Sequence, residues 1–233
     1  MNMNIKGAIF DLDGTLIDTE PIYYSAADQM IEKYGNGKKM DWDTKIKTLG
    51  SPELVTAKII VDTYELKLTP EEFITKRNAI TSELFKKCPF IDGAKEITHK
   101  FKHELNFKLA LATSSTRVNF DFKTFNKKDW LKEDFDSIVL GDDQRIKKGK
   151  PSPDIFILAA KEIGLEPKEC IIFEDSVGGI KAGIDSGAGI VIGIPDPHLR
   201  HKAEELKYDE KVTKLILLNN IKDFDWSLVK PQN

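Results

Sequence analysis

The strongest constraint on the fold of this 233-residue chain is a series of five short apolar runs separated by longer stretches. The runs cover residues 5–10, 107–112, 137–140, 170–173 and 189–194 and are rich in isoleucine, valine and phenylalanine. Such short, nearly continuous runs are typical of strands buried on both faces, and their alternation with helices indicates a parallel sheet. The sequence therefore predicts an α/β fold with a doubly wound, Rossmann-like parallel sheet. Residues 212–218 are a candidate edge strand.

Almost a hundred residues separate the first apolar run from the second, far more than one crossover helix needs. Over 22–34 apolar residues recur at helical spacing, and Gly35 follows as a stop signal. The segments SPE at 51–53 and TPE at 69–71 each place a capping hydroxyl before a proline and an acid, the pattern of a helix start. We predict a helical cap domain over 18–91, inserted into a discontinuous core of 1–17 and 92–233. In the helix that starts near 51, the predicted buried face consists of Leu54, Ala57, Val61 and Tyr64.

Charge and composition exclude several classes of protein. Thirty-five Lys and Arg against 38 Asp and Glu leave a net charge of -3, so nucleic acid is not an expected partner. No apolar run approaches the roughly 20 residues that span a bilayer, and the first residues do not resemble a signal peptide. Cys88 and Cys170 provide no disulfide framework. We expect a monomeric cytoplasmic protein whose two thiols are buried and unreactive.

Polar residues follow four of the predicted strands. The segments are DLDGT at 11–15, TSS at 113–115, GDD at 141–143 and EDS at 174–176, and Lys150 precedes a helix start at Ser152 and Pro153. In an open α/β sheet, ligands bind at the carboxyl ends of the strands. The sequence therefore predicts a site at this edge, built mostly from carboxylates.

Several carboxylates at one edge repel one another, and a divalent cation removes that conflict. Mg²⁺ prefers oxygen ligands, typically one or two carboxylates with waters and a phosphate. Asp11, Asp175 and Glu174, with a backbone carbonyl near Asp13, are candidate ligands. In an extended segment Asp11 and Asp13 project to the same side, and Gly14 permits the turn that follows.

Thr113 and Ser114 offer hydroxyls and backbone amides that could hold phosphate oxygens, and Lys150 supplies positive charge. An aspartate nucleophile, a metal, a phosphate clamp and a second aspartate that exchanges a proton make up a phosphoryl-transfer site. A phospho-receiver signalling module also combines acids, Thr or Ser and Lys at a parallel-sheet edge. The long insertion and the second carboxylate, Asp13, disfavour that alternative.

The sequence resembles the haloacid dehalogenase superfamily of phosphohydrolases, whose four motifs occur here in order as DLDGT, ATSS, GKPSPDIF and FEDSVGGIKAG. The resemblance extends over essentially the whole chain, including a cap inserted after the first motif as in β-phosphoglucomutase-like members. The segments LIDTEPIYY, LALATSS, FDFKT and IVLGDD are most similar to the pseudouridine-5′-phosphatase branch. Sugar-phosphate and glycerol-phosphate phosphatases are the next most similar, and phosphosugar mutases are a further alternative.

The resemblance implies a role for each matching residue. Asp11 would attack phosphorus and form an aspartyl phosphate, and Asp13 would protonate the leaving alcohol and then activate water. Thr113 and Ser114 would hold the phosphoryl group, and Lys150 would neutralise it. Mg²⁺ would be bound by Asp11, by the backbone carbonyl of Asp13 and by Asp175 with Glu174. The expected substrate is a small phosphomonoester, and pseudouridine 5′-phosphate is the first candidate.

Substrate choice is expected to come from the cap, where the candidates are Glu20, Tyr23, Tyr24, Gly50 and Arg77. The related sugar mutases have a histidine where this chain has Tyr23, which favours hydrolysis over mutase chemistry. The four histidines show no common pattern and are predicted to be surface or helix residues; they are His99, His103, His198 and His201.

Overall fold

The computed structural model describes residues 4–35, 37–49, 51 and 53–232. The chain divides into two compact units, each with its own buried interior. The sheet unit comprises Met1–Asp18, Pro89–Asp121 and Phe125–Asn233, and the helical unit comprises Thr19–Cys88 and Phe122–Thr124. The helical unit thus includes a segment, Phe122–Thr124, that lies far from 18–91 in the sequence.

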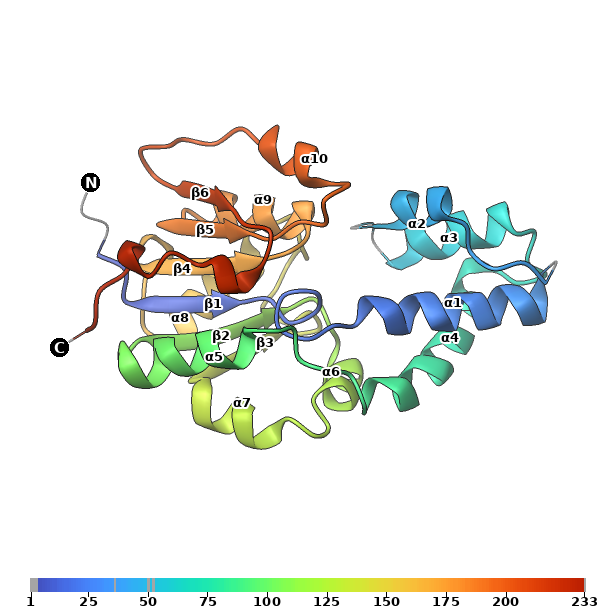
Figure 1. Ribbon diagram of the computed structural model, residues 1–233, viewed down its shortest axis with the longest axis horizontal. Helices are drawn as coiled ribbons and strands as arrows, with labels where there is room; N and C mark the ends of the chain where they lie inside the picture. Colours follow the sequence, from blue (N-terminus) through green and yellow to red (C-terminus); the bar gives the residue numbers. More distant parts are fainter. Residues whose placement is uncertain (1–3, 36, 50, 52, 233) are drawn as a thin grey trace. The chain divides into compact units, whose positions relative to one another are not determined.

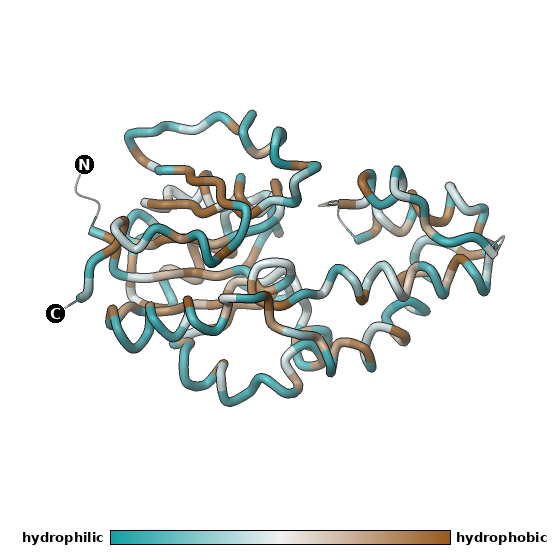
Figure 2. The backbone as a smooth tube through the Cα atoms, viewed as in Figure 1, coloured by the Kyte–Doolittle hydropathy of each residue, from teal (hydrophilic) through white to brown (hydrophobic). Residues whose placement is uncertain are grey.

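The sheet unit contains six parallel strands in the order β3-β2-β1-β4-β5-β6 (Figure 1). The strands are β1 (Gly7–Phe10), β2 (Lys108–Thr113), β3 (Ser137–Leu140), β4 (Cys170–Glu174), β5 (Ile190–Gly193) and β6 (Lys214–Leu217). Every residue of β1, β4 and β5 is buried, and the strands are mostly hydrophobic (Figure 2). The predicted doubly wound α/β fold is confirmed, with β6 as one of its two edge strands. The strand order reverses at β1, which makes the carboxyl end of β1 the expected place for a ligand.

The helices of the sheet unit cover both faces of the sheet. They are α5 (Ala94–His99), the π-helix η1 (Lys100–Glu104), α6 (Arg117–Lys123), α7 (Lys128–Asp134), α8 (Asp154–Glu162), α9 (Val177–Asp185) and α10 (Arg200–Glu204), with short 3₁₀ turns η2 (Pro167–Glu169), η3 (Ile221–Asp223) and η4 (Trp226–Leu228). The end of α6 belongs to the helical unit. Because side chains alternate along a strand, each face has its own core. Ile9 and Ile172 lie in a cluster with residues of α8 and α9, whereas Phe10 and Phe173 stack at 4.6 Å and contact Phe101 of η1.

The segment that leaves β1 and the segment that returns lie side by side. The amide of Asp18 donates to the carbonyl of Pro89 at 3.0 Å, and the amide of Ile91 donates to the carbonyl of Leu16 at 2.9 Å. Ile17 also forms an antiparallel bridge with Phe90. These bonds hold both connections together beside the end of β1, where the carboxylates follow.

Four helices form the helical unit: α1 (Glu20–Tyr34), α2 (Trp42–Thr48), α3 (Glu53–Thr63) and α4 (Pro70–Phe85). α4 begins where TPE predicts, since Thr69 Oγ1 accepts from the Glu72 amide at 3.2 Å and Glu72 Oε2 accepts from the Thr69 amide at 2.8 Å. α3 begins next to Pro52, which lies outside the described residues. The prediction that Leu54 is buried is wrong: it is 51% exposed. The core-facing residues of α3 begin at Ala57, so the first turn of the helix lies beyond the core.

None of the described helices is both long and apolar enough to cross a membrane. Cys88 and Cys170 are both buried, as predicted. Burial raises the pKa of the Cys170 thiol to about 12, so this sulfur stays protonated and inert.

Candidate active site

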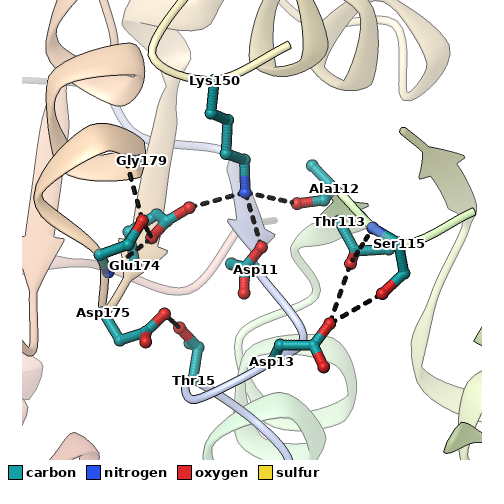
Figure 3. A network of polar contacts seen from close by, with 11 residues as sticks. Asp11, Asp13, Thr15, Ala112, Thr113, Ser115, Lys150, Glu174, Asp175 and Gly179 are labelled. Carbon is teal, nitrogen blue, oxygen red and sulfur yellow. Dashed lines mark hydrogen bonds and ion pairs between the residues drawn. The ribbon is translucent and has the colours of Figure 1, made fainter. Parts of the chain in front are cut away.

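The carboxyl ends of β1, β2 and β4 bring the predicted polar residues of the sheet unit to one edge (Figure 3). Phe10, the last residue of β1, pairs with Leu111 of β2 on one side and with Phe173 of β4 on the other. Asp11 follows directly, and its amide donates to the carbonyl of Phe173 at 3.0 Å. The register of the sheet therefore places Asp11 between Ala112 of β2 and Glu174, which ends β4.

Lys150 binds two carboxylates from different strands. Its Nζ donates to Asp11 Oδ1 and to Glu174 Oε1, both at 2.6 Å, and to the carbonyl of Ala112 at 3.1 Å. The side chains of Lys150 and Asp11 are 9% and 8% exposed, and that of Glu174 is 1% exposed. A buried ion pair of this kind requires well-placed partners, because each charge has lost most of its water. Lys150 therefore fixes the position of Asp11.

Glu174 is itself held by the start of α9. Its Oε2 accepts from both the amide and the hydroxyl of Ser176 at 3.0 Å, and Ser176 Oγ accepts from the Gly179 amide at 3.0 Å. A Cβ atom at position 179 would lie 1.8 Å from Glu174 Oε1, so only glycine leaves room for this carboxylate. Both Glu174 oxygens thus have partners within the protein.

Asp13 faces the end of β2 (Figure 3). Its Oδ2 accepts from Ser115 Oγ at 2.9 Å and from Thr113 Oγ1 at 3.4 Å, and the Ser115 amide donates to Thr113 Oγ1 at 3.1 Å. Sequence reasoning selected Thr113 and Ser114 and missed Ser115. Ser115 is buried, whereas Ser114 is exposed. The TSS triplet indicated hydroxyls at this edge, but which of them turns inward depends on the path of the chain after β2.

Asp175 lies against the turn that follows Asp13. Its Oδ1 accepts from Thr15 Oγ1 at 3.1 Å. Gly14 has φ +80°, and a Cβ atom there would lie 2.2 Å from Asp175 Oδ2. The glycine therefore supplies both the left-handed backbone and the space for the carboxylate.

The carboxylates of this edge raise one another's pKa values. Burial raises the pKa of Asp11 to about 7, opposed by Lys150 and reinforced by Glu174 and Asp13. Burial also raises the pKa of Asp175 well above its usual value, with further increases from Glu174 and Asp11. Burial by itself would lower the pKa of Lys150, but Asp11 and Glu174 outweigh it and raise that pKa, so Lys150 remains charged.

This donor set fits a hard divalent cation. Asp11 is a buried carboxylate and Asp175 a partly buried one, and their ionised forms are destabilised without more positive charge than Lys150 provides. Oxygen donors with excess negative charge are the chemistry that Mg²⁺ prefers.

The two other predicted acids at this edge have structural partners. Asp142 Oδ2 accepts from the amide of Arg117, at the start of α6, at 2.9 Å. Asp143 pairs with Arg145 at 2.7 Å, and hydrogen bonds from Arg145 lower the pKa of Asp143 to about 2.

The cap candidates belong to the helical unit. Arg77 is 5% exposed and pairs with Glu53. Its guanidinium lies 5.1 Å from the ring centre of Tyr23. The hydroxyl of Tyr23 accepts a hydrogen bond from Lys123 Nζ at 3.1 Å. The ring of Tyr24 lies 5.0 Å from Lys45 Nζ. Glu20 is exposed in the first turn of α1. Gly50 lies outside the described residues. The buried Arg77 and the partly buried Tyr23 form one cluster, which Lys123 joins from a distant part of the sequence.

Comparison with known proteins identifies similar sequences and structures. A protein named probable pseudouridine-5′-phosphatase from Saccharomyces cerevisiae is 37% identical over 201 residues, covering 83% of this chain and 84% of that protein. The (DL)-glycerol-3-phosphatase 2 of Arabidopsis thaliana is 30% identical over 230 residues, covering 97% and 92%. The solved structure of a HAD hydrolase, family IA, variant 3, from Entamoeba histolytica superposes with a TM-score of 0.74 at 24% identity, covering 96% and 97%. The family model for haloacid dehalogenase-like hydrolases matches residues 8–192, and the chain belongs to that family.

Proposed function

We propose that this hydrolase is a Mg²⁺-dependent phosphatase that cleaves small phosphomonoesters through an aspartyl phosphate on Asp11, with pseudouridine 5′-phosphate as its preferred substrate. The observation that carries the proposal is the arrangement around Asp11. Lys150 holds one oxygen of Asp11, and a second carboxylate, Asp13, stands two residues away against hydroxyls of β2. This is the set of groups that a two-step phosphoryl transfer requires.

In the first step, Asp11 acts as the nucleophile. Lys150 binds Oδ1 at 2.6 Å, so attack falls to Oδ2. A bond forms between Oδ2 and phosphorus, the bond between phosphorus and the ester oxygen breaks, and the alcohol leaves with a proton from Asp13. Lys150 would also offset the charge of the transferring phosphoryl group, and Thr113 with the backbone after β2 would bind its oxygens.

In the second step, Asp13 acts as the general base. It takes a proton from water, the water oxygen attacks phosphorus, and the bond from phosphorus to Asp11 Oδ2 breaks, releasing inorganic phosphate and the free carboxylate. Hydrogen bonds from Ser115 and Thr113 orient Asp13 for both proton transfers. We propose that Ser115 is a positioning residue for Asp13.

Asp11, Asp175 and the backbone carbonyl of Asp13 are the proposed Mg²⁺ ligands. Bound there, the ion supplies charge neutralisation between the carboxylates and the phosphate. Glu174 is more consistent with positioning Lys150, because its two oxygens are engaged by Lys150 and Ser176.

The substrate is inferred from the relatives. The yeast protein at 37% identity carries the name of a pseudouridine-5′-phosphatase, and the Arabidopsis protein at 30% that of a glycerol-3-phosphatase. The greater identity favours pseudouridine 5′-phosphate, and glycerol 3-phosphate is the second candidate.

Phosphate release with Mg²⁺ across pseudouridine, nucleoside, flavin, sugar and glycerol monophosphates tests the proposal. We expect the highest kcat/KM on pseudouridine 5′-phosphate and no release after chelation of the metal. Comparable slow rates on every ester would contradict pseudouridine 5′-phosphate as the preferred substrate but would not contradict the assignment as a phosphatase. Interconversion of sugar phosphates without free phosphate would contradict the phosphatase assignment itself.

Asp11→Asn provides the matched test of the nucleophile. It keeps the shape of the side chain and removes the attacking carboxylate, so we expect phosphate release to be abolished. Turnover at the wild-type rate in this variant would show that Asp11 is not the nucleophile.

A further inference from the structure

Two histidines that showed no pattern in the sequence lie together in the sheet unit. His99 is the last residue of α5, and His103 lies four residues later in η1. Their ring centres are 4.5 Å apart, and both rings are exposed. The π-helical turn between them is an uncommon conformation that is found frequently at functional sites. Both are exposed helix residues, as predicted, and the structure adds that their rings are neighbours.

A buried carboxylate completes the group. Asp134 ends α7, its side chain is 4% exposed, and its Oδ1 lies 3.1 Å from His103 Nε2. One ligand atom from each of His99, His103 and Asp134 lies within 4.8 Å of the other two. Two imidazoles and a carboxylate are the ligand types of zinc-class ions.

The carboxylate is held in place by a buried network. Thr98 Oγ1 donates to Asp134 Oδ2 at 2.6 Å and accepts from Trp130 Nε1 at 2.9 Å. Thr98 is fully buried and Trp130 nearly so. One oxygen of Asp134 is thus anchored in the protein while the other is directed towards the exposed histidines. Hydrogen bonds of this kind orient the ligands of protein metal sites.

We propose that His99, His103 and Asp134 bind one divalent transition-metal ion of the zinc class. Ligands of a tetrahedral Zn²⁺ at about 2.0–2.1 Å from the ion are about 3.3 Å apart, which is close to the His103–Asp134 separation. His99 would supply the third ligand through adjustment of its exposed ring, since its ligand atom lies within 4.8 Å of the other two, and water would take the fourth position. Mg²⁺ is disfavoured here because it prefers oxygen ligands.

The position of the group points to a structural ion. Two residues separate Asp134 from β3, and three separate the end of η1 from β2, so the cluster lies near the amino ends of these strands. Asp11 and Thr113 lie at the carboxyl ends. The ion would link η1 to α7 and stabilise the sheet unit without taking part in the reaction.

Isothermal titration of the full chain with Zn²⁺, in excess Mg²⁺, tests the proposal. We expect one equivalent to bind and to raise the melting temperature. His99→Ala and His103→Ala should each weaken Zn²⁺ binding at least about tenfold. Loss of a residue that only hydrogen-bonds to a metal ligand already weakens metal binding by about that factor, and loss of a ligand should weaken it at least as much. His99→Ala is the more informative variant, because a purely structural His103–Asp134 pair predicts no dependence on His99.

His198→Ala is the matched control. His198 is exposed and its Nδ1 lies 2.8 Å from Asp196, so it repeats the histidine–carboxylate pair outside the cluster. We expect this variant to bind Zn²⁺ as the wild type does. Circular dichroism of each variant establishes that it is folded.

Three results would overturn the proposal: no Zn²⁺ binding by the wild type, unchanged affinity in His99→Ala, or binding that Asp175→Asn abolishes and His99→Ala does not. The last result would place the ion among the catalytic carboxylates. Because binding is measured directly, failure here does not bear on the phosphatase assignment.

Discussion

At the scale of single residues, Lys150 has the largest expected influence on the site. It is a buried cation between Asp11 and Glu174, and no exposed lysine of the same loop makes such contacts. Removing one partner of a buried ion pair leaves the other charge uncompensated, which is more damaging than replacing the whole pair. Loss of Lys150 should therefore lower both the stability of the protein and its activity.

Lys150→Met is expected to lower the free energy of unfolding of the metal-free protein by about 3–5 kcal/mol. Phosphate release should fall at least about a hundredfold, since the charge that offsets the phosphoryl group is lost. Denaturant unfolding and kcat/KM measure the two effects. Lys148→Met is the control, because Lys148 is exposed two residues away. Equal effects in both variants would contradict the role of the buried ion pair.

Asp175→Asn is expected to stabilise the metal-free protein at alkaline pH, because burial and the neighbouring Glu174 and Asp11 raise the pKa of Asp175. Folding penalises the ionised form of such an acid. The penalty is fully present above the folded-state pKa and disappears as the pH falls towards about 4. We expect a gain of about 1–2 kcal/mol at high pH and little at low pH, with activity lost.

The stability of the metal-free wild-type protein should also decrease as the pH rises. Burial raises the pKa of Asp11 from its ordinary value of 3.8 to about 7. The metal-free protein should therefore lose stability as the pH rises from the ordinary pKa of an aspartate through 7. Thermal melts across this range, with and without Asp175→Asn, measure both trends. A variant that is less stable than the wild type at alkaline pH would show that Asp175 is favourably paired without metal.

At the scale of secondary structure, the turn after β1 has the tightest requirements. It must reverse direction beside the returning segment at Phe90 and still leave room for a carboxylate from β4. Gly14 meets both requirements, since it has φ +80° and no Cβ. A substitution there affects the site through the backbone.

Gly14→Ala should lower stability by about 1–2 kcal/mol through the left-handed backbone and, in addition, displace Asp175. Gly164→Ala is the matched control, because Gly164 has φ +73° but no atom within 4 Å of its added Cβ. We expect similar backbone strain in both variants and loss of Mg²⁺ affinity and activity in Gly14→Ala alone. Full activity in Gly14→Ala would mean that Asp175 can move without consequence.

At the scale of the whole molecule, the two units have separate cores, and the proposed Mg²⁺ ligands all belong to the sheet unit. Metal binding should therefore stabilise one unit directly. A ligand that binds only the native state adds about 2.7 kcal/mol at a hundred times its dissociation constant.

Hydrogen exchange with and without Mg²⁺ tests this expectation. Slower exchange is expected in the segments after β1 and β4, with little change in the interior of α1 and α3. Asp175→Asn should remove the difference. An equal increase of protection in the variant would place the ion elsewhere.

Much of the fold was predictable from local sequence. The six strands occur within two residues of the predicted runs, and α4 starts at the predicted cap. Short-range patterns suffice here because a buried strand or a helix start is specified by a few neighbouring residues. The acids and Lys150 could also be placed at one edge, because parallel strands share the orientation of their ends.

What could not be predicted concerns side-chain direction and contacts between distant segments. Ser115 rather than Ser114 turns towards Asp13, Leu54 lies beyond its core, and Lys123 joins a cluster a hundred residues away from Tyr23. His99 and His103 meet Asp134 across 31 residues or more of sequence, through the packing of η1 and α7.

For this protein, then, the sequence alone was sufficient for the order of elements, the parallel sheet and the chemical types gathered at its edge. These follow from hydrophobic periodicity and capping, which act between near neighbours along the chain. The partners of each carboxylate, the pKa values they share and the histidine cluster depended on packing, because those contacts join residues that only folding brings within a few ångströms of one another.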